Sequence, residues 1–492
     1  MRSVVAGGLA LLLMGCTTPE PAPPPPAPTQ STPAPDTFTV ITTVMPTTLD
    51  PAAATTAADA IVALNAFSRL MLVQPTDGEL KPDLAEDCLF TSPTTYQCSL
   101  PEGLTFANEH KLTSSDVKFS IERAYRLYVE QTGVQMLDSL DRIVTPDDRT
   151  INFELKWPDS QFGYSLALPV ASIVDEELYD PDALRPAEGL PAGSGPYTVV
   201  TLAEEHLVFD RDPGYVGGVR PTLEEVTLRS VADSAAAEAT MADGTADVVW
   251  QALDSAARAR ATIGPAPATT ATPARGYAAI RLPEAHVERL WFHPASAWWV
   301  NQDVRKAVAM ALQGDRTLAS LIPPGVSGSA TTFPVGGNPD PVDVSERRPR
   351  LRLSYASKIP DQRDRAAVIR DRLEAKAGMS VQLVPDTADA DLTLSVRPAW
   401  VNTAFGWLQA YTAQPLPESA DQLSTWLTAA SGTTDPEERQ ELLTSIQEQA
   451  ALDVTVLPQT ITDEIVFVGD GVSLQGEAFG PGWQLGFWGF RA

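Results

Sequence analysis

The pattern of apolar and polar residues from residue 37 onward predicts both strands and helices. Apolar residues alternate with polar ones over residues 37–41, and a turn follows at Leu49-Asp50-Pro51. Residues 59–71 are predominantly apolar and predict a helix. Another helix is expected to begin after Thr113, whose side chain can cap the first amides, with Asp116 complementing the positive end. The residues expected on its apolar face are Val117, Ile121, Ala124 and Tyr128.

The second half of the chain contains the clearest alternation of strand and helix. A strand is predicted over residues 351–355, a helix over 361–377 that ends at Gly378, and strands over 381–384 and 391–396. The residues that share a face of this helix are Ala366, Ile369, Leu373 and Ala377. This βαββ order predicts an α/β lobe.

Glycine and proline mark further boundaries. Residues 193–196 predict a sharp turn that leads into a strand beginning at Tyr197, and a strand is expected over residues 226–231. Residues 301–312 predict a helix with one apolar face. That face contains Val304, Val308 and Leu312.

The N-terminal residues have the order of a secretory signal. A cation at Arg2 precedes an apolar run over residues 4–13, and Gly15 stands just before Cys16. The run is too short to span a bilayer as a helix. We therefore expect residues 1–15 to be a signal peptide that is removed ahead of a lipid-modified Cys16. The alternative is an ordinary signal peptide cut elsewhere, with an incidental cysteine.

The following stretch, over residues 17–36, reads TTPEPAPPPPAPTQSTPAPD. Such a sequence favours extended polyproline II conformation and has too few large apolar groups to collapse. At about 3.1 Å per residue it could hold a folded body up to about 60 Å from a lipid anchor. Residues 16–36 are thus predicted to be a tether, either semi-rigid or disordered.

Composition and charge limit the remaining possibilities. The chain has 492 residues, of which 43% are hydrophobic and 20% charged, so it can bury a large core in two or more lobes. The formal net charge is −28 and is spread along the chain. A charge of this sign argues against a general affinity for nucleic acid or anionic lipid and favours a solvated acidic surface.

Cys88 and Cys98 are predicted to form a disulfide. An exported protein meets an oxidising environment in which disulfides persist. The intervening sequence places residues 92–94 at the centre of a hairpin, with the two sulfurs on opposed strands. The alternative is a pair of free buried thiols.

The sequence contains no pattern that predicts catalysis. Neither residues 192–197 nor residues 325–330 have the Gly-x-Ser-x-Gly spacing of a nucleophile elbow. The histidines show no paired metal-ligand spacing; they are His110, His206, His286 and His293. We therefore expect no catalytic residue, no cofactor and no metal site. An envelope hydrolase stays a remote alternative without a motif.

Several segments, taken in order, resemble one protein family. They are LTSSDVKFSIERA at residues 112–124, GSGPYTVV at 193–200, DPGYVGGVRPTLEEVTLRSV at 212–231, MADGTADVV at 241–249 and NQDVRKAVAMAL at 301–312. This series resembles the extracellular solute-binding proteins of peptide and nickel ABC importers, solute-binding family 5. The cysteine and proline-rich start is similar to that of actinobacterial lipoprotein members.

The resemblance implies a fold and an organisation. The fold is α/β and two-lobed, like the type II (cluster C) periplasmic binding proteins, with an extra domain in the first lobe. The first lobe would comprise residues 37–77, 195–281 and 460–492. The extra domain would comprise residues 78–194, and the second lobe residues 282–459.

The resemblance also implies a function. The protein would capture oligopeptides or similar solutes in a cleft between the lobes and deliver them to ABC permease subunits. It would act as a lipid-anchored monomer on the outer face of the cytoplasmic membrane, without binding nucleic acid. The alternative of the same fold is a surface lipoprotein that senses or scaffolds without transport.

Aromatic residues of the second lobe are the candidates for ligand contact. The predicted ligand-binding residues are Trp400, Arg397, Trp407, Tyr411 and Trp299. Arg397 could clamp a carboxylate, and Trp400 and Trp407 would share a face if their stretch were helical. Core packing is the alternative for each tryptophan.

Two features near the candidate site are less defined. No acidic residue for a ligand amine can be matched in the short stretch over residues 386–418, where Asp389 and Asp391 could simply flank a strand. At the C-terminus, an aromatic group is expected to pack onto the first lobe. It consists of Trp483, Phe487, Trp488 and Phe490.

Overall fold

A computed structural model describes residues 37–492 apart from residues 75–77, 188, 264–275, 341–343, 345, 347, 397–398 and 475–484. Contacts divide the chain into Met1–Thr37 and Phe38–Ala492, and the second unit is the body described below. The predicted signal peptide, the lipidation site Cys16 and the tether lie outside the described residues.

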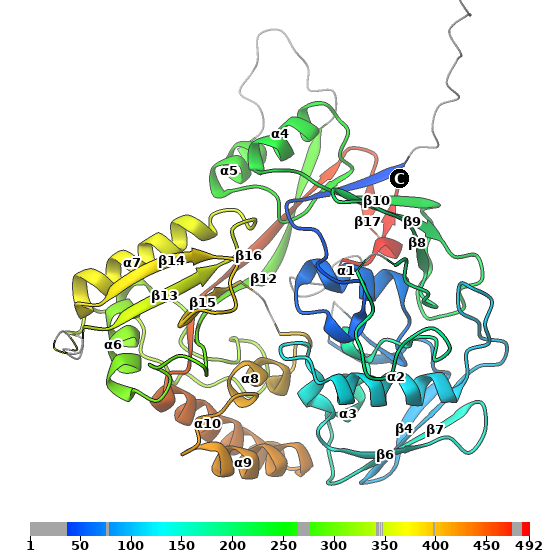
Figure 1. Ribbon diagram of the computed structural model, residues 1–492, viewed down its shortest axis with the longest axis horizontal. Coiled ribbons are helices and arrows are strands. Elements are labelled where there is room, and N and C mark those ends of the chain that lie inside the picture. The colour runs from blue at the N-terminus through cyan, green and yellow to red at the C-terminus, as the bar shows by residue number, and fades with distance from the viewer. Residues whose placement is uncertain are drawn as a thin grey trace, which may run out of the picture. The chain divides into compact units, whose positions relative to one another are not determined.

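A mixed sheet runs through both lobes of the body and, within the described residues, has ten strands (Figure 1). In spatial order these are β14 (Ser380–Pro385), β13 (Arg350–Tyr355), β15 (Leu392–Ser395), β12 (Tyr277–Phe292), β16 (Val456–Gly469), β11 (Val248–Val249), β1 (Phe38–Thr42), β10 (Glu225–Ser230), β9 (His206–Arg211) and β8 (Tyr197–Leu202). The strands predicted at residues 37–41, 197 and 226–231 are β1, β8 and β10. Strands β8–β11 and β1 belong to the first lobe, and β13–β15 to the second.

The two longest strands connect the lobes. β12 and β16 pair antiparallel, with a register shift between Leu282 and His286 and another between Glu288 and Arg289. At about 3.3 Å per residue, the sixteen residues of β12 span about 50 Å. A β-bulge bends a strand and increases its twist locally, so the crossing pair is irregular at these two positions.

The first lobe packs helix α1 (Ala57–Ala66) against its sheet. Thr56 and Asp59 form a reciprocal capping box at its start, so the helix begins two residues before the predicted position. The predicted end at residue 71 is wrong, because Phe67 is extended and Met71 begins β2 (Met71–Val73). Backbone packing fixes this end. A Cβ at Gly193 would lie 1.9 Å from the Ala66 carbonyl oxygen.

The remaining elements of the first lobe are short. They are η1 (Pro51–Ala53), α4 (Ser234–Ala242), α5 (Ser255–Ile263), β17 (Ser473–Leu474), η5 (Phe487–Gly489) and β18 (Phe490–Arg491). Strand β3 (Leu80–Pro82), at the start of the extra domain, pairs antiparallel with β2. The predicted C-terminal packing is present for Phe487 and Phe490, which are fully buried in the first-lobe core. The ring of Phe487 lies 5.1 Å from that of Phe209. Trp483 lies outside the described residues.

The extra domain combines a four-stranded antiparallel sheet with helix α2 (Ser114–Leu127). Its other elements are β4 (Asp87–Ser92), β5 (Thr95–Ser99), β7 (Thr150–Leu155), β6 (Leu140–Val144), η2 (Val134–Leu137), α3 (Phe162–Ser165) and η3 (Pro169–Ala171). Cys88 and Cys98 stand opposite each other on β4 and β5 and form the predicted disulfide. The capping box of Thr113 and Asp116 is present.

One residue of the predicted α2 face lies elsewhere. Val117, Ile121 and Ala124 are buried as expected, but Tyr128 ends the helix in a left-handed conformation and is 40% exposed. The four-residue spacing fails there because the helix has already stopped.

The second lobe contains the predicted βαββ unit. β13 pairs parallel with both β14 and β15, and α7 (Gln362–Ala377) connects β13 to β14. Gly378 ends α7 at a φ of 62°. The predicted apolar faces of α7 and α6 (Gln302–Leu312) are buried. The lobe also contains η4 (Gln313–Asp315), α8 (Ala404–Thr412), α9 (Ala420–Gly432) and α10 (Pro436–Asp453).

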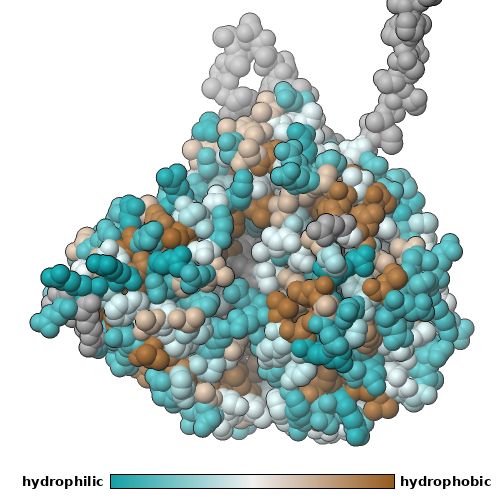
Figure 2. All heavy atoms as spheres, in the orientation of Figure 1, coloured by the Kyte–Doolittle hydropathy of each residue, from teal (hydrophilic) through white to brown (hydrophobic). Residues whose placement is uncertain are grey.

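The face drawn in Figure 2 is mostly hydrophilic, with separate small hydrophobic patches. This agrees with the solvated surface expected from the net charge of −28. No helix among the described residues is both long and apolar enough to cross a membrane.

Candidate functional site: a cleft between the lobes

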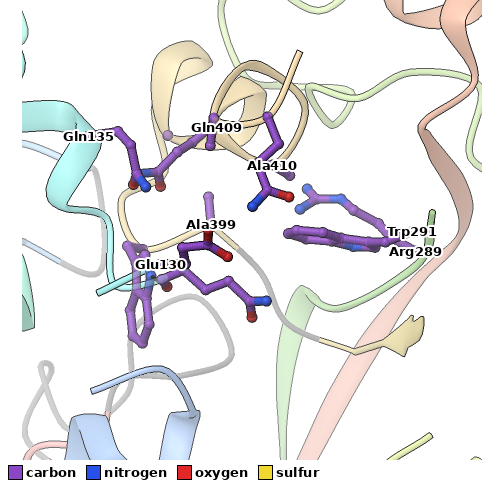
Figure 3. Close-up of a pocket in the computed structure, with 12 residues that line it drawn as sticks. Glu130, Gln135, Arg289, Trp291, Ala399, Gln409 and Ala410 are labelled. Carbon is purple, nitrogen blue, oxygen red and sulfur yellow. Dashed lines mark hydrogen bonds between the residues drawn. The ribbon is translucent and has the colours of Figure 1, made fainter. Parts of the chain in front are cut away.

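A cleft lies where the extra domain, the crossing strand β12 and the second lobe meet (Figure 3). It has a volume of about 560 Å³ when the part open to solvent is included. Its lining residues are Glu130, Gln131, Gln135, Arg289, Trp291, Ala399, Trp400, Gly406, Gln409, Ala410, Ala413 and Gln414. The cleft therefore draws its walls from three parts of the body that are distant in sequence.

Trp400 reaches from the second lobe into the extra domain. It is 2% exposed and packs in the same hydrophobic cluster as Val134 and Leu168. Its Nε1 donates a hydrogen bond of 2.8 Å to the carbonyl oxygen of Gln131. Trp400 thus lines the cleft and also connects the second lobe to the extra domain.

Two further hydrogen bonds cross from the extra domain to the second lobe. The Gln409 Nε2 atom on α8 donates to Gln135 Oε1 at 3.1 Å. The Ser160 amide donates to the Ser431 carbonyl at 3.0 Å. These bonds show that the body is in an arrangement where the two lobes touch across the cleft.

The crossing strand supplies the wall opposite the two glutamines. Arg289 and Trp291 lie two apart on β12, so their side chains leave the same face of the sheet. In Figure 3 they extend toward the gap from one side, and Gln135 and Gln409 lie on the other. The Arg289 guanidinium carbon lies 4.7 Å from the centre of the Trp407 ring, within the range of a cation–π contact.

The structure places the other predicted aromatics in the second-lobe core. Trp407 is 2% exposed, and its Nε1 donates to Asn402 Oδ1 at 2.8 Å. Tyr411 is fully buried and donates to Asp453 Oδ2 at 2.6 Å. Burial, followed by this hydrogen bond, raises the pKa of Tyr411 well above its ordinary value, so the phenol keeps its proton. Neither side chain lines the cleft, although Trp407 supports Arg289.

Trp400 and Trp407 do not share a helical face. Helix α8 begins at Ala404, with Thr403 as its cap, so Trp400 precedes it. The two indoles belong to different hydrophobic clusters. The spacing of seven residues is therefore uninformative here, because only one of the pair is helical.

The remaining predicted positions lie away from the lining. Trp299 is buried in the second-lobe core, and its carbonyl accepts a hydrogen bond from Arg305. Asp389 forms an ion pair with Arg352 at 2.7 Å, and Asp391 accepts a hydrogen bond from the Ser296 hydroxyl at 2.6 Å. Both carboxylates therefore have partners close to strand ends and do not line the cleft. Arg397 lies outside the described residues. Its role as a ligand clamp stays a prediction.

Sequence reasoning missed the residues that β12 and the extra domain contribute. Arg289 and Trp291 stand in the strand sequence VERLWF, where a cation alternates with an indole on one face. That alternation was the available signal. Glu130 and Gln135 carried no such signal, because the segment before η2 and η2 itself reach the cleft only through tertiary packing.

The described residues of the site do not form the ligand set of a metal centre. Among the residues that the structure describes, no group of three or more His, Cys, Asp or Glu side chains could hold a metal ion. The described lining residues offer amides, two indoles, one guanidinium and one carboxylate, which suit binding of a polar organic solute through hydrogen bonds and ring faces.

The fold is that of the two-lobed periplasmic binding proteins, and solved structures with this fold are similar over most of the chain. The protein AgaA from A. tumefacien R10, solved with agropinic acid, is 20% identical with a TM-score of 0.80, over 92% of this chain and 98% of that one. A dipeptide-binding protein from Pseudoalteromonas sp. SM9913, solved with Met-Leu, is 16% identical with a TM-score of 0.75, over 92% and 99%.

Residues 79–347 match the model of the bacterial extracellular solute-binding proteins, family 5 Middle, and the chain belongs to this family. The probable D,D-dipeptide-binding periplasmic protein DdpA of Escherichia coli strain K12 is 28% identical over 214 residues, 41% of each chain. The probable ABC transporter periplasmic-binding protein SapA of the same strain is 23% identical over 282 residues, 52% of this chain and 49% of that one. The chain thus spans less than half the length of these two curated relatives.

Proposed function

We propose that the protein captures oligopeptides or similar solutes in the cleft and delivers them to the permease of an ABC importer. The cleft carries this proposal, because its walls come from both sides of a crossing strand pair. A solute that contacts both walls stabilises the closed arrangement by the difference between its affinities for the closed and open forms. Binding alone is sufficient for this role, and no bond in the solute has to change.

The lining supports an elongated polar solute. Amide side chains at Gln131, Gln135 and Gln409 can each donate and accept hydrogen bonds, as a peptide backbone requires. The indoles of Trp291 and Trp400 offer flat apolar surface. The names of the relatives point the same way, since they include a D,D-dipeptide-binding protein and an ABC transporter binding protein.

We propose that this function operates outside the cytoplasmic membrane. Residues 1–15 would direct export, a lipid on Cys16 would hold the protein at the outer face, and residues 16–36 would let the body reach a permease. The division into a first lobe, an extra domain and a second lobe at the boundaries given above belongs to the same proposal.

Recovery of the natural solute tests this function. The protein is purified from its own host, denatured, and the released small molecules are identified by mass spectrometry. We expect a peptide or a similar polar solute in about equimolar amount, which should bind again to emptied protein. A preparation that releases nothing and binds no member of a dipeptide library would contradict solute capture.

A sensing role is the second candidate. The relatives include the HTH-type transcriptional regulator SgrR of Pectobacterium atrosepticum, 27% identical over 167 residues, which make up 28% of that protein. A related segment therefore occurs in a protein named for regulation. Uptake of the identified solute by cells with and without this gene separates the roles. Uptake that is the same in both supports sensing.

A further inference from the structure

Resting on the proposed function, we propose that the cleft selects solutes by a carboxylate group, which Arg289 and Trp291 bind, and that a free amine is not required. The inference concerns the chemical class of the solute, so it can fail while solute capture itself holds.

Arg289 is placed as an anchor for an anion. Its side chain is only 4% exposed, yet it lines the cleft and lies over the Trp407 ring. A guanidinium is planar and presents a fork of N–H donors that matches the two oxygens of a carboxylate. The cation–π contact with the Trp407 indole, together with burial, holds the guanidinium at the cleft before a solute arrives.

Trp291 provides an independent observation beside it. Its Nε1 atom is buried and has no hydrogen-bond partner among the described residues. An indole N–H can only donate, and a buried donor without an acceptor is costly. Because Trp291 follows Arg289 at a spacing of two on β12, both donors belong to the same wall of the cleft. A bound carboxylate could accept from both.

The described lining offers little for an amine. Among the described lining residues, Glu130 is the sole carboxylate, and it is exposed to solvent. An ion pair in water is weak, so a ligand amine near Glu130 should change affinity by at most about fivefold. A charge-assisted hydrogen bond to a buried cation is worth more, about tenfold or greater.

Blocked dipeptides test this class directly. Dialysed protein is mixed with a dipeptide library prepared in four forms, which are free, N-acetylated, C-terminally amidated and blocked at both ends. Retained compounds are measured by mass spectrometry after gel filtration. We expect free and N-acetylated peptides to be retained within about fivefold of each other. Both amidated forms should fall by about tenfold or more.

The possible failures are distinguishable. Equal retention of amidated peptides, or loss of retention on N-acetylation, would overturn the carboxylate inference and leave solute capture intact. Retention of none of the four forms would count against both this inference and peptide capture.

A conservative variant of Trp291 tests whether the solute carboxylate binds at this wall of the cleft. Trp291→Phe keeps an aromatic ring and removes the Nε1 donor, so the free and N-acetylated forms should bind about 3- to 10-fold more weakly while amidated forms change little. Trp298→Phe is the matched control, because Trp298 makes its own hydrogen bond to the Arg350 carbonyl outside the cleft. An equal effect of the two variants, or an effect on all four forms, would overturn the assignment.

Discussion

Two of the contacts between the lobes differ in chemistry. Across the cleft, Trp400 and Gln409 of the second lobe meet Gln131 and Gln135 of the extra domain through packing and neutral hydrogen bonds, and we name this set the Trp400 contact. Beside the crossing strands, Asp361 at the start of α7 meets Ser255 and Arg258 of α5, and this set is the Asp361 contact.

The Trp400 contact is more deeply buried than the Asp361 contact, and the two should therefore differ in strength. Trp400 is 2% exposed, so the contact it makes excludes water and buries a large apolar ring. The Asp361 and Arg258 side chains are 36% and 30% exposed, and an ion pair in that setting contributes between 0 and about 1 kcal/mol. We infer that the Trp400 contact dominates the energy of closure and that the Asp361 contact adjusts it weakly.

Trp400→Ala should have the largest effect. Truncating a buried tryptophan costs about 3 kcal/mol or more, and here the loss falls on the closed arrangement, because the ring joins one lobe to the other. Solute affinity should therefore drop about 100-fold by isothermal titration calorimetry, with the circular dichroism spectrum unchanged. Trp400→Phe should lose only part of the solute affinity that Trp400→Ala loses. Unchanged affinity in Trp400→Ala would remove the basis of the comparison.

Gly133→Ala should disturb the same contact without touching Trp400 itself. Gly133 has a φ of 93°, and a Cβ there would lie 3.0 Å from Leu168 Cδ1 and 3.2 Å from Trp400 Cδ1. Backbone strain and displacement of the ring should together weaken solute binding by about 10-fold.

Gly103→Ala is the matched control for this variant. Gly103 has a similar φ of 78° in the same domain, but a Cβ there would contact nothing within 4 Å. Both variants should lower the melting temperature, and only Gly133→Ala should lower affinity. Similar affinity losses in both would show that general strain in the extra domain, and not the position of Trp400, governs closure.

The comparison also shows what could be predicted from the sequence. Helices α2 and α7 were predicted closely because their signals are local: a capping box at Thr113 and Asp116, and a glycine at Gly378 that adopts the left-handed conformation. The disulfide followed from a hairpin of eleven residues. Such features depend on neighbours in the chain, and tertiary packing left them in place.

The cleft could be predicted only in part, because long-range packing assembles it. Trp400 was identified as a site residue, but its partner Gln131 is 269 positions away. Arg289 lies on a strand whose role as a crossing element depends on pairing with β16. Trp407 and Tyr411 carry the same aromatic signal as Trp400 yet are buried in the second-lobe core. Residue type alone cannot distinguish a cleft wall from a core.

A double-mutant cycle on Gln135 and Gln409 should resolve the polar part of the Trp400 contact. Each Gln→Ala change removes one side of the 3.1 Å hydrogen bond, and the pair should couple by about 0.5–1 kcal/mol in solute binding. Because both amides are neutral, this coupling should be nearly the same at low and high salt. A coupling near zero would assign the whole contact to the packing of Trp400.

Asp361→Asn should have the smallest effect and a different dependence on salt. Asparagine also tolerates the left-handed conformation that Asp361 adopts, at a φ of 65°, and can still accept from Ser255, so the main loss is the charge. Solute affinity should fall by at most about fivefold in low salt, and the difference from the unmodified chain should vanish near 1 M salt.

Glu224→Gln is the control, because Glu224 forms an exposed ion pair with Arg211 within the first lobe and should leave affinity unchanged. If Asp361→Asn weakened binding as strongly as Trp400→Ala, and did so at every salt concentration, the ranking of the two contacts would be reversed, since exposed charges cannot produce a large effect that salt fails to screen.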